Sequence, residues 1–118
     1  MKVISGKDKY FADENGILFN LNYEFDKKVL KIDNIDKFNE AFNFSKRYFL
    51  SYEIDEIEFV YSKNYLIITI NNSKIFLDLR DKEKFFNIAL NVYKKLKEKN
   101  IKFKEIDLRY GYDHIIIR

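Results

Sequence analysis

Apolar side chains recur at every second position in three consecutive segments in the middle of the chain, residues 57–61, 66–70 and 75–79. Because a strand directs successive side chains to opposite faces, this period of two predicts three strands that share one buried face. The residues between the segments, 62–64 and 71–73, are Ser, Lys and Asn residues that favour turns. We therefore predict an antiparallel meander across this region.

Helical spacing of apolar residues flanks the meander on both sides. A first helix, capped by Asp33 or Asn34 and ending near Leu50, has its apolar positions at Ile35, Phe38, Phe42 and Phe49, with Ala41 and Tyr48 beside them. Asp81 is predicted to cap a second helix, from Lys82 to about Lys99, with Asn100 as a left-handed stop. The apolar stripe of the second helix is Phe85, Ile88, Ala89, Val92 and Leu96.

Further strands are predicted at both ends of the chain. Residues 10–12 and 17–19 flank Asn15-Gly16, which is typical of a hairpin turn, and residues 29–32 are a short candidate strand. After the second helix we expect an extended piece over 102–110, a turn at Gly111 and a terminal strand over 112–117. This order predicts an α+β fold: a mostly antiparallel sheet, two helices packed on one face, and the C-terminal strand at the sheet edge.

Composition sets the size of the domain. The 118 residues, 47% hydrophobic and 35% charged, are enough for one core, so we expect residues 1–118 to form a single domain. The net charge is +3, with both signs interspersed, and the chain has no cysteine for a disulfide or a thiolate site. It also has no apolar run of the roughly 18 residues that a membrane span needs.

The residue types that catalysis requires are scarce. His114 is the one histidine, and the three glycines are isolated, so we predict no metal site, no phosphate loop and no cofactor. Carboxylate pairs occur at 13–14, 55–56 and 105/107, where neighbouring lysines predict solvated surface charges rather than a shielded acid and base. We expect a protein that is not an enzyme.

A nucleic-acid-binding domain is the alternative. The densest basic cluster lies around the end of the second helix, with Tyr93 and Phe103 nearby for stacking on bases. It consists of Lys94, Lys95, Lys97, Lys99, Lys102 and Lys104. The helix dipole favours cations at this position in any protein, and that structural explanation outweighs binding.

The end of the chain has the composition of a docking surface. Ile115-Ile116-Ile117 would form an edge strand whose only flanking charges are Asp113 and Arg118, although exposed edges are normally blunted. A partner strand could add to such an edge through the backbone. Tyr112, His114 and Ile116 would point to one face and Asp113, Ile115 and Ile117 to the other, and the period alone leaves open which face is buried.

Arg109 and Tyr110 have two interpretations. The Arg109 guanidinium suits bidentate binding of a carboxylate on a partner. Alternatively, Arg109 pairs inside the domain with Asp107 or Glu105, and the Tyr110 ring covers the edge of the core.

Two motifs resemble one family. KYFADENGILF (residues 9–19) is similar to the hairpin that opens the extracytoplasmic β-domain of the FtsQ/DivIB cell-division proteins, and IKFKEIDLRYGYDHIIIR (residues 101–118) resembles its closing segment. The predicted element order between them also follows the family. The proline and glycine common in the family between the hairpin and the first helix do not occur between Leu21 and Ile32.

The resemblance implies a function. Such a domain is a non-catalytic scaffold of the divisome, on the outer side of the bacterial cell membrane at the division site, and it holds membrane-anchored coiled-coil partners of the FtsB/DivIC and FtsL types. We would then expect this chain to be a fragment of a longer single-pass protein, with Met1 added. The implied partner-binding residues are Arg109, Tyr110, Tyr112, Asp113, His114, Ile115, Ile116 and Ile117.

Overall fold

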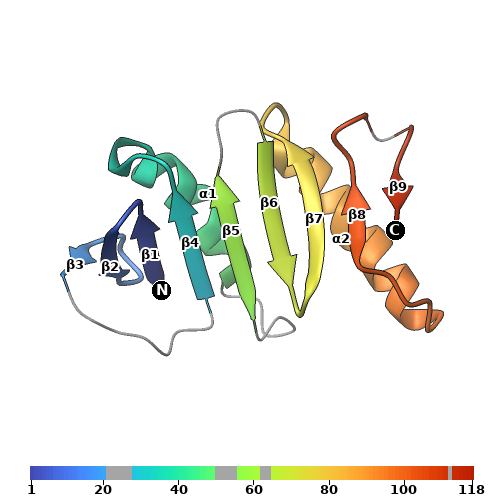
Figure 1. The fold of residues 1–118 in the computed structure, drawn as a ribbon, viewed down its shortest axis with the longest axis horizontal. Helices are drawn as coiled ribbons and strands as arrows, with labels where there is room; N and C mark the ends of the chain where they lie inside the picture. Colours follow the sequence, from blue (N-terminus) through green and yellow to red (C-terminus); the bar gives the residue numbers. More distant parts are fainter. Residues whose placement is uncertain (21–27, 50–55, 62–64, 112) are drawn as a thin grey trace.

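The computed structural model describes residues 1–20, 28–49, 56–61, 65–111 and 113–118. Within these residues, nine strands form one sheet in the order β3-β2-β1-β4-β5-β6-β7-β8-β9, which extends along the longest axis of the molecule (Figure 1). The strands are β1 (Lys2–Ser5), β2 (Asp8–Ala12), β3 (Leu18–Phe19), β4 (Lys28–Ile32), β5 (Ile57–Tyr61), β6 (Tyr65–Ile70), β7 (Ser73–Asp78), β8 (Glu105–Asp107) and β9 (Ile116–Ile117). The helices are η1 (Ile35–Lys37, a 3-10 turn), α1 (Phe38–Phe49) and α2 (Lys82–Glu98).

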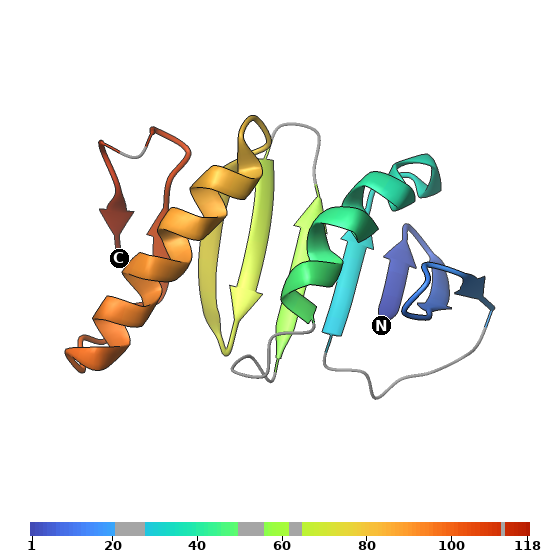
Figure 2. The same cartoon turned by 180° about the vertical axis from the view of Figure 1, so that it is seen from behind.

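Both α-helices lie on the same face of this sheet, as the two opposite views show (Figures 1 and 2). Antiparallel pairing joins β1 to β2, β2 to β3, β5 to β6, β6 to β7 and β8 to β9. Parallel pairing joins β4 to both β1 and β5, and β8 to β7. The predicted fold class is confirmed, including the C-terminal strand at the sheet edge. In the described part of the chain, neither helix is long and apolar enough to cross a membrane.

The predicted meander is present as β5, β6 and β7. Its alternate residues are almost fully buried under the helices: Ile57, Phe59, Tyr61, Leu66, Ile68, Ile70, Ile75 and Leu77. The turn between β6 and β7 uses Asn71 and Asn72, both with positive φ (46° and 75°), as a two-residue hairpin loop requires. The turn predicted at 62–64 lies outside the described residues.

The N-terminal part contains one strand that the pattern did not indicate. The hairpin of β2 and β3 and the strand β4 are confirmed, but β1, only four residues long, lies between β2 and β4 and pairs with both. In the hairpin loop the Asp13 carboxylate accepts the N–H groups of Asn15 and Ile17, each at 2.9 Å. Gly16 has a φ of 79°, and a Cβ there would lie 3.0 Å from the Phe42 ring of α1.

The predicted helix ends need one correction. Asn34 does act as a cap, because its side chain accepts the N–H of Asp36, but it caps the 3-10 turn η1 that precedes α1. Asp81 occupies the position before α2, with a left-handed backbone (φ 54°), and its side chain makes no capping hydrogen bond, contrary to prediction. Asn100 has the predicted left-handed conformation (φ 57°).

An aromatic cluster fills the space between the helices and the sheet. Phe44 of α1 lies at its centre, with ring centroids 5.9 Å from Phe59 of β5 and 6.1 Å from Phe86 of α2. Neither Phe44 nor Phe86 is in the predicted stripes, yet both are buried, whereas Ile35 is 38% exposed. The reason is that both helices contact the sheet over a wider arc than one narrow stripe.

Replacing Phe44 by Ala should destabilise the domain by about 3–5 kcal/mol, because the change leaves a cavity where rings from both helices and the sheet meet. Urea denaturation measures the loss. Asn43→Ala is the matched control, since Asn43 is exposed on the same helix, and it should change stability by no more than about 0.5 kcal/mol. Equal effects of the two changes would contradict this packing.

Candidate docking site at the C-terminal edge

The C-terminal strand is shorter than predicted. Asp113 is in a turn, His114 is in a bend and β9 begins only at Ile116, while Tyr112 lies outside the described residues. Gly111, with a φ of 100°, reverses the chain after β8, and its N–H donates to the Leu108 carbonyl at 3.2 Å. The predicted extended piece over 102–110 is a strand only at β8, residues 105–107. We call the connection between β8 and β9, residues 108–115, the excursion. The sequence pattern assigns most of these residues to strands.

The outer edge of β9 follows from its hydrogen bonds to β8. Arg118 donates its N–H to the Glu105 carbonyl at 3.0 Å and accepts the Glu105 N–H at 3.2 Å. Because bonded and non-bonded pairs alternate along an antiparallel ladder, Ile117, opposite Ile106, turns its N–H and C=O away from β8. With β9 last in the sheet, these two backbone groups face the open edge (Figure 1).

The pairing of β9 with β8 shows which face of the sheet the side chains of Ile116 and Ile117 occupy. Ile117 lies opposite the fully buried Ile106 on the face that carries the helices, and is still 46% exposed. Ile116 lies opposite Asp107 on the other face and is half-buried. Ile115 packs partly against the core, whereas Asp113 and His114 are exposed.

Asp107 is fully buried, which corrects the prediction that it is a solvated surface charge. Its Oδ2 accepts the Arg109 Nη2 at 2.7 Å, and its Oδ1 accepts both the Arg109 Nε and the Arg109 N–H at 3.0 Å. Arg118 reaches the same carboxylate with its Nη1 at 3.5 Å. Two arginines, one on each side of the excursion, thus cover a single carboxylate.

Sequence spacing alone could not reveal this burial. The parallel register of β7 and β8 places Asp107 beside Phe76, on the face opposite the helices. The Arg109 guanidinium lies above that neighbour, 4.7 Å from the centroid of the Phe76 ring and 5.7 Å from that of Tyr65. An arginine over aromatic faces is held by cation–π attraction as well as by its salt bridge.

Arg109 and Tyr110, adjacent in sequence, have different environments. The structure shows Arg109 in the internal pair with Asp107, the alternative that the sequence left open. Tyr110 is 62% exposed, so its ring does not cover the edge of the core. A hollow of about 410 Å³ lies beside it and is also lined by Asp78, Arg80 and Phe85.

Hydrogen bonding sets the ionisation of Asp107. Burial acts to raise the pKa of this carboxyl, but hydrogen bonds from the Arg109 side chain and N–H, together with the Arg109 charge, outweigh it and hold the pKa below its usual range. The same pairing raises the pKa of Arg109. Both groups therefore stay charged at neutral pH.

The basic cluster lies at the far end of α2 and in the segment that leads to β8. Its lysines are exposed, as predicted, but the neighbouring aromatic rings pack on each other: the Tyr93 and Phe103 centroids are 5.6 Å apart, edge to face. Lys97 Nζ lies 5.6 Å and 5.7 Å from the same two centroids. The contact between the rings and the position of Lys97 over both of them leave less of their surface for stacking on bases than two separate exposed rings would offer.

Comparisons with known proteins add no family: no protein-family model matches this chain, and no curated protein matches it.

Asp107→Asn should lower the free energy of unfolding by about 1–3 kcal/mol at pH 7, because it removes a buried charge that Arg109 and Arg118 both contact. The pKa of Asp107 is depressed in the folded state, so its contribution is present above the unfolded pKa of about 4 and is lost as pH falls through the folded value. Denaturation between pH 7 and pH 2 measures the difference. The exposed control Asp8→Asn should show no such difference; a gap for Asp107→Asn that stays constant with pH would contradict the pairing.

Proposed function

We propose that this chain is an FtsQ/DivIB-type β-domain, a non-catalytic scaffold of the bacterial divisome that binds FtsB/DivIC-type and FtsL-type partners outside the cell membrane. Partner binding occurs by addition of a strand to β9. The observation that carries the proposal is the open edge of β9, where the N–H and C=O of Ile117 face away from the sheet. The resemblance of the two end motifs supplies the identity of the partners.

The surroundings of this edge support an added strand. No proline occurs in β9, and the Ile117 side chain is 46% exposed on the helix-bearing face, where it offers an apolar contact beside the backbone groups. Backbone pairing provides affinity, and side chains at alternate positions provide selectivity. Soluble proteins protect such edges with proline, charge or brevity; β9 has two residues and a following arginine but no proline, so one added strand can still pair with it.

Arg109 and Tyr110 have distinct parts in this proposal. Arg109 is a positioning residue: its pair with Asp107 fixes the start of the excursion between β8 and β9. Tyr110 follows directly and projects into solvent, next to the hollow lined by Asp78 and Phe85. An exposed tyrosine beside a concave surface is a favourable anchor for a protein partner.

Ile117→Pro should weaken binding of an FtsB-type extracytoplasmic peptide at least about tenfold, because it removes the outward N–H and obstructs the added strand. The internal ladder should persist, since that N–H does not bond to β8. Isothermal titration measures the affinity, and thermal unfolding confirms the fold. Ile117→Thr is the matched control: it keeps the N–H and should retain most of the affinity. Unchanged binding by Ile117→Pro would rule out strand addition at β9.

Two variants should distinguish a residue that contacts the partner, Tyr110, from a residue that holds the connection between β8 and β9 in place, Arg109. They are Tyr110→Ala and Arg109→Ala. Because Tyr110 is exposed, its loss should reduce binding by about 1–2 kcal/mol and leave the unfolding free energy within about 0.5 kcal/mol. Arg109→Ala should instead destabilise the fold by about 1–3 kcal/mol, since it removes the main partner of a buried carboxylate. Titration and urea denaturation of both variants give the comparison; a Tyr110→Ala variant with full affinity would exclude the anchor.

A further inference from the structure

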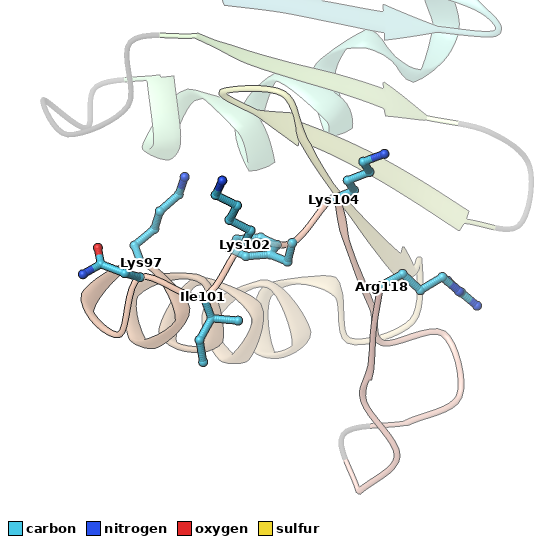
Figure 3. A pocket seen from close by; sticks show the side chains of 7 residues that line it. Lys97, Ile101, Lys102, Lys104 and Arg118 are labelled. Atoms are coloured by element: carbon cyan, nitrogen blue, oxygen red, sulfur yellow. The ribbon is translucent and has the colours of Figure 1, made fainter.

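A second concave surface lies next to the end of β9. It is a hollow of about 660 Å³ between the end of α2, the segment that leads into β8, and the residue after β9 (Figure 3). Its lining includes four cationic residues and two apolar ones: Lys97, Lys102, Lys104, Arg118, Ile101 and Phe103. A volume of this size is typical of a binding pocket.

Positive charge is concentrated around this hollow. Residues 94–104 contain six lysines and one glutamate, a net charge of +5, whereas the whole chain has a net charge of +3. The remaining residues therefore sum to −2. The basic character of the protein comes entirely from this one region, which will attract anions over about a Debye length, roughly 10 Å at 0.1 M salt.

The three lysines of the hollow have no carboxylate paired with them, in the described part of the chain, to neutralise their charge. Some cations elsewhere on the surface do pair with carboxylates, as in Lys31 with Glu58 at 3.1 Å and Arg47 with Glu83 at 3.2 Å. Among the residues that the structure describes, no carboxylate forms an ion pair with Lys97, Lys102 or Lys104. At the rim, Arg118 is bound to Glu105 at 3.2 Å.

An apolar floor accompanies these charges. The half-buried Phe103 ring packs edge to face against Tyr93, which holds it in place beneath Lys97. Ile101 is 47% exposed. A ligand for this hollow therefore combines negative charge with at least one apolar group.

We infer that this hollow binds an acidic polypeptide segment that carries an apolar or aromatic side chain. Carboxylates of the segment contact Lys102 and Lys104, and the apolar side chain lies against Phe103. Charge complementarity carries this inference, which concerns the side chains of the segment between α2 and β8 and does not rest on the proposed function.

The arrangement favours a peptide over a membrane or a nucleic acid. Figure 3 shows Lys97, Lys102 and Lys104 extending to one side while Ile101 points to the other, whereas a membrane-binding surface presents cations and apolar groups to the same plane. A nucleic acid would need an extended track of phosphate contacts and open faces for base stacking. Here the cations surround one hollow, and the aromatic rings contact each other.

The probe for this surface is a fluorescein-labelled octapeptide of six glutamates around two central phenylalanines, followed by fluorescence anisotropy. The wild-type chain should bind it at low salt and release it as salt rises, because the contacts are exposed ion pairs. The charge-reversal variant Lys102→Glu/Lys104→Glu should bind at least about tenfold more weakly, from about two- to fivefold for each lost ion pair plus the new repulsion. A peptide with glutamine in place of glutamate should not bind.

The matched control is Lys7→Glu/Lys9→Glu, which produces the same net charge from exposed lysines in and beside β2. It should change the affinity less than about twofold, and circular dichroism confirms that both variants fold. Equal weakening by the two variants would overturn the inference, because bulk charge would then explain binding. So would tighter binding to a single-stranded DNA oligonucleotide or to phosphatidylglycerol vesicles than to the peptide. Binding of an FtsB-type peptide at β9, measured in the same variants, should not change.

Discussion

Two helices have to cover a sheet of nine strands, and large aromatic side chains allow them to do so. Phe44 of α1 and Phe86 of α2 approach each other and both contact Phe59 beneath them, with centroids within about 6 Å. Such rings contribute buried area and favourable edge contacts together. The two helices and the centre of the sheet are therefore one packing unit, and the remaining strands attach to either side of it.

This dense aromatic packing has a cost at Tyr61. Its side chain is buried, and its hydroxyl has no hydrogen-bond partner among the described residues. Burial, with a smaller contribution from the Glu40 charge, raises the pKa of Tyr61 far above its usual value, so the hydroxyl stays neutral. The ring is retained for its packing, and an unpaired polar atom accompanies it.

The sequence predicts those helices and strands whose residue pattern is visible within a short stretch of the chain. The meander, the β2–β3 hairpin and both helices follow from alternation, helical spacing and turn residues, which act over a few neighbours. β1 is not predicted because its two apolar residues, Val3 and Ile4, are adjacent and show no alternation, and its place depends on pairing with β2 and β4. The burial of Asp107 is not predicted for another reason: it depends on the parallel register with β7 and on two arginines outside β8. The different environments of Arg109 and Tyr110 are not predicted either, because they depend on the same long-range contacts.

Asp107 also disfavours an alternative register of β7 and β8 that the chain does not adopt. In the observed register of β7 and β8, Ile106 lies under the helices and Asp107 lies on the opposite face. A slip by one residue would exchange the two faces, placing the Asp107 carboxylate beneath the helices among apolar side chains and moving Ile106 to the opposite face. Burial of a charge among apolar side chains costs several kcal/mol, so the observed register is favoured. The charge of Asp107 and the burial of Ile106 thereby favour the same alignment of β7 and β8, and this alignment places β8 where β9 pairs with it at the edge of the sheet.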